Sequence, residues 1–155
     1  MANEKTREKR KVVLASGTFD LLHLGHVRYL EEAKKAGGPN AKLIVIVARD
    51  ATVEKRRGTK PIMSENQRRA LVGSLKVVDE AILGYEDFDI EKVIEKINPN
   101  IIALGYDRSD IAQSVKRYVE ENKLNIEIVK ISKFSEDELD SSSKIKQKII
   151  EYFKR

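Results

Sequence analysis

Five short apolar runs recur along the chain, and they restrict its fold more than any other feature. Each is rich in β-branched residues and apolar almost without interruption: residues 11–16, 42–48, 80–84, 100–105 and 126–131. Strands with one face in water alternate apolar and polar residues, whereas parallel strands covered on both faces form continuous apolar runs. We therefore predict a buried parallel strand in each run.

Helical patterns separate these runs. Ser64 and Gln67 form a capping-box pattern, and Asp89 is a suitable helix N-cap. Apolar residues three and four positions apart predict helices over residues 27–38, 64–75, 89–99, 111–122 and 141–153. Strand and helix thus alternate along the whole chain.

This alternation predicts an α/β fold, a Rossmann-like doubly wound parallel five-stranded sheet with strand order 3-2-1-4-5 and helices on both faces. No repeat or linker interrupts residues 11–155, which we take as a single domain, and residues 1–10 are expected to form a mobile basic tail. Residues 49–63 lack clear periodicity and are predicted to form a functional or disordered loop.

In such a sheet, ligands bind at the carboxyl ends of the strands, where the strand order reverses. For order 3-2-1-4-5, that point lies between the first and fourth strands. Residues 17–26, with the sequence GTFDLLHLGH, are therefore expected beside residues 105–110, with the sequence GYDRSD.

The charge distribution favours a small anionic ligand. The 30 Lys and Arg residues exceed the 25 Asp and Glu residues, giving a net charge of +5, and much of the excess lies in the tail and in residues 55–60. With 6% aromatic residues and no continuous basic helix face, a dedicated nucleic-acid module is disfavoured. Small polyphosphates fit the charge better.

Composition also limits the cellular setting. No apolar run reaches the roughly 20 residues of a membrane span, and no secretory signal is visible, so we expect a cytoplasmic protein without membrane contact. The absence of cysteine excludes thiolate metal sites and cysteine nucleophiles. A 35% share of charged residues is typical of thermophiles.

Both histidines of the chain lie in residues 17–26. The spacing places His23 just before a helix and His26 in its first turn, with Gly25 allowing a ligand to approach the backbone. A helix N-terminus favours anions through its free N–H groups and dipole. Two imidazole donors at such a terminus predict a polyphosphate site.

Several other sites are excluded by their missing patterns. The chain contains no His-Glu-x-x-His zinc motif, no phosphate-binding Gly-x4-Gly-Lys-Ser/Thr loop and no Gly-x-Gly-x-x-Gly dinucleotide motif. It also lacks the Gly-x-Ser-x-Gly elbow that presents a nucleophilic serine. Kinase-like, dehydrogenase and hydrolase functions are therefore disfavoured.

Residues 17–37 closely resemble the signature of the cytidylyltransferase-like nucleotidyltransferases, whose His-x-Gly-His motif holds the triphosphate of ATP or CTP. The resemblance continues, in family order and spacing, through residues 60–84, 100–107 and 141–145. Within that family, the chain looks most like the archaeal-type FAD synthetases, which are FMN adenylyltransferases.

The resemblance implies transfer of AMP from ATP to FMN, giving FAD and pyrophosphate, with Mg²⁺ or another divalent cation. The alternative is a CTP-dependent cytidylyltransferase acting on glycerol 3-phosphate or a similar phosphorylated alcohol. That pattern has an arginine shortly before its Ser-Thr-Thr-Lys-Ile segment, whereas residues 131–145 have none, which weakens the CTP reading. A nucleotide-binding regulatory domain is the non-enzymatic alternative, and the resemblance leaves a homodimer open.

The family's functional positions transfer to this chain by motif. Catalytic roles are implied for His23, His26, Lys55, Lys60 and Arg68, where either loop lysine could reach the reacting phosphates. Asp20 is expected to orient the site or to bridge to a metal held largely by the phosphates. Nucleotide contacts are implied for Gly17, Thr18, Phe19, Asp20, His23, Gly25, His26, Gly105, Tyr106, Asp107, Ser141, Ser142 and Ser143.

Simpler explanations for some of these residues remain open at this point. Thr18 and Phe19 suit an ordinary turn, and residues 55–60 suit a solvated basic loop. Tyr106 could stack on an adenine or flavin ring or lie at the edge of the core. A single serine would be sufficient to cap the last helix, so three in a row favour contact with a ligand.

Overall fold

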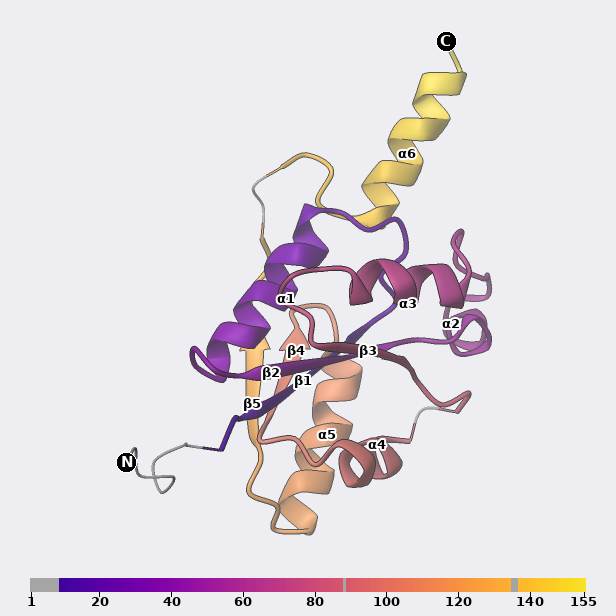
Figure 1. Ribbon diagram of the computed structural model, residues 1–155. Helices are drawn as coiled ribbons and strands as arrows, with labels where there is room; N and C mark the ends of the chain where they lie inside the picture. Colours follow the sequence, from indigo (N-terminus) through magenta and orange to yellow (C-terminus); the bar gives the residue numbers. More distant parts are fainter. Residues whose placement is uncertain (1–8, 88, 135–136) are drawn as a thin grey trace.

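The computed structural model describes residues 9–87, 89–134 and 137–155. Its centre is a five-stranded parallel sheet with the order β3-β2-β1-β4-β5, as predicted (Figure 1). The strands are β1 Val12–Gly17, β2 Lys42–Val47, β3 Glu80–Leu83, β4 Ile101–Gly105 and β5 Glu127–Ile131. Each lies within one or two residues of a predicted run.

The described helices are α1 Leu24–Ala36, α2 Asp50–Arg57, α3 Glu65–Gly73, α4 Ile90–Ile97, α5 Ser109–Glu121 and α6 Ser142–Phe153. Predicted helix starts are confirmed at Ser64, Asp89 and Ser141, whose side chains accept hydrogen bonds from the backbone N–H groups of Gln67, Lys92 and Lys144. Helix α1 begins at Leu24 with His23 as its N-cap, as the histidine spacing predicts and three residues before the apolar pattern begins at Val27.

The sheet is buried on both faces. Val13 and Ala15 of β1 pack in a core with Leu30 of α1 and Val72 of α3. On the other face, Leu14 packs in a second core with residues of α4 and α5. Side chains of successive strand residues point to opposite faces, so a strand between two cores needs apolar residues at every position.

Residues 49–63 are not the continuous loop that the sequence predicts, because they contain α2. This helix buries only Val53, and Gly58 ends it with a φ of 83°. A helix with a single buried residue has no repeating apolar face, so its sequence carries no period.

Helix α6 extends from the sheet and has no buried residue (Figure 1). The predicted mobile tail, residues 1–10, lies outside the described residues up to position 8, and Arg10 donates hydrogen bonds to the carbonyl oxygens of Asn40 and Ala41. Among the described residues, every helix is too short or too polar to cross a membrane.

Candidate functional site

A cavity of about 540 Å³ lies at the carboxyl ends of β1 and β4, where the strand order reverses. The β1–α1 turn, the β4–α5 turn and the start of α6 form its walls. Every residue predicted to contact a nucleotide lines this cavity, from Gly17–Asp20 and the two histidines to Gly105–Asp107 and Ser141–Ser143. Segments far apart in the sequence therefore meet at one site.

The two histidine rings stack inside this cavity. Their centroids are 3.7 Å apart, with an interplanar angle of 26°. The backbone N–H of His23 donates to Nδ1 of His26 over 3.2 Å, so the neutral His26 ring carries its proton on Nε2. Nδ1 of His23 is buried and has no hydrogen-bond partner among the described residues. Buried polar atoms are normally paired, so this nitrogen is an exception within the site.

Burial keeps both rings neutral near pH 7. It lowers the pKa of His26 to about 3, with a further decrease from the neighbouring His23 that Asp20 partly opposes. Burial also lowers the pKa of His23, and Asp140 opposes that change. The pair therefore offers N–H donors to an anion without a net charge of its own.

Gly25 allows the protein's own groups to come close, in addition to lining the cavity. A Cβ at this position would lie 2.9 Å from Nδ1 and Cε1 of the His23 ring and 3.0 Å from the carbonyl oxygen of Asp140. Real Cβ atoms do not approach that closely. Glycine is thus required for the packing of the histidine against the segment before α6.

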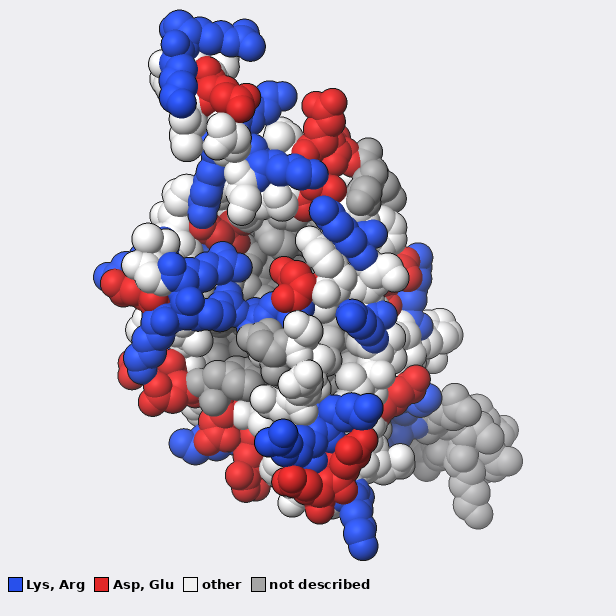
Figure 2. Space-filling view, turned by 180° about the vertical axis from the view of Figure 1, so that it is seen from behind, with Lys and Arg blue, Asp and Glu red and all other residues white. Residues whose placement is uncertain are grey.

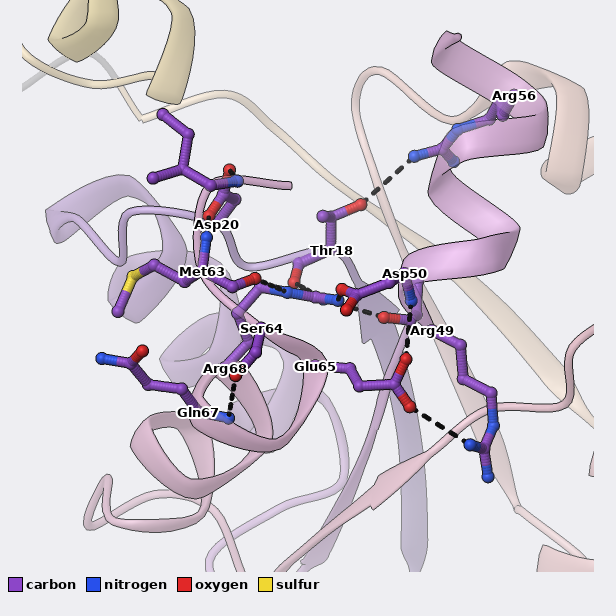
Figure 3. A network of polar contacts seen from close by, with 12 residues as sticks. Thr18, Asp20, Arg49, Asp50, Arg56, Met63, Ser64, Glu65, Gln67 and Arg68 are labelled. Atoms are coloured by element: carbon purple, nitrogen blue, oxygen red, sulfur yellow. Dashed lines mark hydrogen bonds and ion pairs between the residues drawn. The ribbon is translucent and has the colours of Figure 1, made fainter. Parts of the chain in front are cut away.

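Arg68, for which the family resemblance implies a catalytic role, lies behind the wall of the cavity. It is 0% exposed and does not line the cavity. Nη1 donates to the carbonyl oxygens of Thr18 over 2.7 Å and Ala48 over 2.8 Å, and Nε donates to that of Met63 over 2.9 Å (Figure 3). Nη2 pairs with Oδ1 of Asp50 over 2.7 Å. With its donors used in this way, Arg68 positions the walls of the site.

Asp20 is also a structural link. It is 3% exposed, and its two carboxylate oxygens accept hydrogen bonds from the backbone N–H groups of Ile62 and Met63 over 2.8 and 2.9 Å. Its carbonyl oxygen accepts a hydrogen bond from the Ser142 hydroxyl. Asp20 therefore ties the β1–α1 turn to the segment before α3 and to α6, and it also lines the cavity.

The predicted loop lysines lie outside the cavity. Lys55 pairs with Asp87 over 2.7 Å at an exposed position, and Lys60 is exposed and absent from the cavity wall. The cationic residues that line the cavity are instead Arg57, Arg108, Lys133 and Lys146. Figure 2 shows Lys and Arg side chains gathered around a hollow and along α6.

Lys133 and Lys146 were not among the site residues predicted from the sequence. Lys133 follows β5, and Lys146 lies in the first turns of α6, so both flank the serine segment. Nζ of Lys133 lies 5.7 Å from the centre of the Tyr106 ring. Residues 131–145 lack the arginine that the cytidylyltransferase pattern has before its serine segment. On this side of the cavity the cations are Lys133 and Lys146 instead.

The chemical character of the cavity is that of an anion site. The N-termini of α1 and α6 and the neutral histidines contribute donors. Four cationic side chains line the cavity beside Asp20, Asp107 and Asp140, and Lys133 and Lys146 pair with Asp140 and Asp20 over 3.9 Å. Among the described residues, no group of three or more His, Asp or Glu side chains could hold a metal ion. The arrangement suits a polyphosphate that brings its own counterion.

Comparison with known proteins supports this reading. The family described as cytidylyltransferase-like matches residues 14–148. A FAD synthase of Methanobrevibacter smithii is 48% identical, over 90% of this chain and 90% of that protein. A FAD synthase of Thermoplasma acidophilum is 47% identical, over 90% of this chain and 94% of its own length.

Solved structures show the same fold. A crystal structure described as the lipopolysaccharide core biosynthesis protein of Thermoplasma volcanium is 43% identical, with a TM-score of 0.73, and covers 82% of this chain and 100% of that chain. Pantoate-beta-alanine ligase from Francisella tularensis, at 16% identity, has a TM-score of 0.63 over 92% of this chain and 67% of its own. That second likeness shows the fold alone.

We expect Arg68→Met to lower the free energy of unfolding by about 3–5 kcal/mol, because Asp50 and three carbonyl groups lose a buried donor. Urea denaturation of the purified variant measures the loss. Arg69→Met, at the next position of α3, is the matched control and should cost less than about 1 kcal/mol. Equal losses in the two variants would contradict the positioning role.

The low pKa of His26 predicts a loss of stability in acid. Its ordinary pKa is 6.5 and its folded value is about 3, so the stabilisation is fully present above pH 6.5 and is lost as the pH falls toward 3. At pH 5 this group alone should cost about 2 kcal/mol. Urea denaturation at pH 7 and pH 5 should show a smaller decrease for His26→Gln than for the parent. The same decrease in both proteins would disprove the assignment.

Proposed function

Because this chain belongs to the cytidylyltransferase-like family, we infer that it is a nucleotidyltransferase that transfers AMP from ATP to FMN, giving FAD and pyrophosphate. The observation that carries this conclusion is the match to relatives named FAD synthase, which are 44–49% identical over 88–94% of this chain. The match extends over 88–95% of those proteins, so it covers nearly their whole length rather than a shared fragment.

The reaction agrees with the side chains at the site. An oxygen of the FMN phosphate attacks the α-phosphorus of ATP, and the bond from that phosphorus to the bridging oxygen of pyrophosphate breaks. A phosphate monoester is already ionised near pH 7, so neither a strong base nor a protein nucleophile is required. Catalysis then depends on position and on stabilisation of the charge that develops.

We assign that stabilisation to the histidine pair. Both histidines line the cavity. Nε2 of His26 is suited to donate a hydrogen bond to a phosphate oxygen, as is Nε2 of His23, whose Nδ1 is buried. For His23 this requires the Nε2–H tautomer. Lys133 and Lys146 are suited to the remaining phosphate charge from the side of α6. Neutral donors stabilise developing charge while leaving the product able to dissociate.

A divalent cation, Mg²⁺ in the first instance, is proposed to arrive with ATP. Mg²⁺ retains several waters and is commonly bound through substrate phosphates with one or two carboxylates. Asp20 is the nearest candidate of that kind in the β1–α1 turn, although two backbone N–H groups already occupy its carboxylate. The cation neutralises phosphate charge when bound.

The first test offers the purified protein ATP or CTP with Mg²⁺, and FMN or glycerol 3-phosphate as acceptor. Product chromatography and pyrophosphate release measure the reaction. We expect FAD from ATP with FMN and no product from the other three pairs. Formation of CDP-glycerol would establish the cytidylyltransferase alternative instead. A protein that binds nucleotide and forms no product with any pair would support the regulatory alternative.

We expect His26→Ala to reduce kcat for FAD formation by about 10²–10³-fold, the usual cost of removing one donor that contacts transition-state charge. Steady-state kinetics with ATP and FMN provides the measurement. Lys35→Ala, at the distal end of the same helix, is the control and should retain the parent rate. A His26→Ala variant as fast as the parent would remove the histidine from the reaction.

A further inference from the structure

A second cavity of about 360 Å³ lies against the other face of the sheet. Its wall is formed by β1, β2 and β4 together with α2, α4 and α5, and is largely apolar: Leu14, Ile46, Val93, Ile102, Leu104 and Val115. Small-molecule sites have volumes of about 300–1,000 Å³ and mostly apolar walls. The polar cavity described above is the proposed phosphate site, and the wall of this second cavity suits a ligand with an apolar body.

The two cavities meet at the carboxyl end of β1. Ser16, Gly17 and Arg108 line both of them. Arg56, in the wall of the apolar cavity, donates from Nη2 to Oγ1 of Thr18 over 3.2 Å, and Thr18 lines the polar cavity. A molecule lying in the apolar cavity could thus reach the polar one with an anionic end, between two arginine side chains.

Polar contacts between α2 and the β3–α4 segment form the mouth of the apolar cavity. The Thr52 hydroxyl donates to the carbonyl oxygens of Glu86 over 2.8 Å and Tyr85 over 3.2 Å. Lys55 and Asp87 form their ion pair at the same edge. The Tyr85 ring is partly exposed there, where it can stack on a flat aromatic ligand.

We propose that the apolar cavity is the acceptor site and that it takes the isoalloxazine ring of FMN. In this arrangement the FMN phosphate lies at Ser16 and Gly17 beside Arg56 and Arg108, and it faces the α-phosphorus of ATP in the polar cavity. The inference rests on the proposed function and adds the place and the chemical class of the acceptor, a phosphate monoester with a flat, largely apolar body.

The shape and polarity of the cavity select against a small polar acceptor. Glycerol 3-phosphate carries hydroxyl groups and no apolar body, so it would leave the apolar wall unfilled. A tricyclic ring removes apolar surface of both ligand and protein from water, which favours binding. Lys55, which pairs with Asp87 at the edge of this cavity, then lies at the mouth of the acceptor site.

The test fills the cavity at its edge. Ala48 is half-buried at the end of β2 and lines the apolar cavity, so Ala48→Phe places a ring in the space assigned to the flavin. Ala51→Phe is the matched control, because Ala51 is exposed on α2 and does not line the cavity. Calorimetric titration with FMN, riboflavin and ATP, each alone, gives the dissociation constants.

We expect Ala48→Phe to raise the Kd of FMN and of riboflavin at least tenfold and to change the Kd of ATP less than twofold, with the control unchanged for all three. Steady-state kinetics should show the same increase in the KM for FMN. A variant that binds FMN as the parent does, in a parent that forms FAD, overturns the acceptor site and leaves the proposed function in place.

Other outcomes are equally decisive. A parent protein that forms no FAD and binds no FMN overturns the proposed function together with the site. Equal weakening of FMN and ATP binding by Ala48→Phe overturns the local assignment. Should circular dichroism show that Ala48→Phe does not fold, Ile111→Trp, which fills the same cavity from α5, replaces it in every comparison.

Discussion

The buried guanidinium of Arg68 is the contact on which the rest of the site depends. It joins the carbonyl groups that follow β1 and β2, the first turn of α2 and the segment before α3. An arginine without solvent contact is unfavourable unless it is paired and hydrogen-bonded. All three nitrogens of this one donate hydrogen bonds, to three carbonyl groups and a carboxylate. Phe19 and Leu21, with φ values of 56° and 50°, keep a strained turn beside it, and such strain persists only where the surroundings fix it.

A parallel sheet with two buried faces gives the molecule two different cavities at one edge. The face with α1 carries the histidines, the serines and the cations, whereas the face with α4 and α5 carries an apolar wall. The end of β1 lies between them because it is the strand at which the order reverses. A reaction between a polyphosphate and a phosphate with an apolar body needs such a pair of adjoining sites, one for each kind of surface.

Local patterns predicted most of the fold. The continuous apolar runs located all five strands, and side-chain caps at Ser64, Asp89 and Ser141 located three helix starts. The apolar pattern did not predict α2, because a helix with only Val53 buried has no apolar period. It also did not include the first turn of α1, because Gly25 lies in that turn. The His-x-Gly-His segment and the serines line the phosphate cavity, because they lie at a strand end and at helix starts that local patterns locate. Arg68 and the loop lysines do not line it.

The sequence by itself determined the sheet, its order and the residues that gather at the phosphate cavity, because hydrophobic period and helix capping are local properties of the chain. Only the tertiary structure decided which charged groups face that cavity. Arg68 is buried behind it, Lys55 lies at a second cavity, and Lys133 and Lys146 lie in its wall. A charged side chain is long and pairs with whatever backbone or carboxylate lies within reach, so its direction is set by neighbours distant in the sequence. The apolar cavity has the same origin, because its wall comes from six separate elements that no local pattern relates.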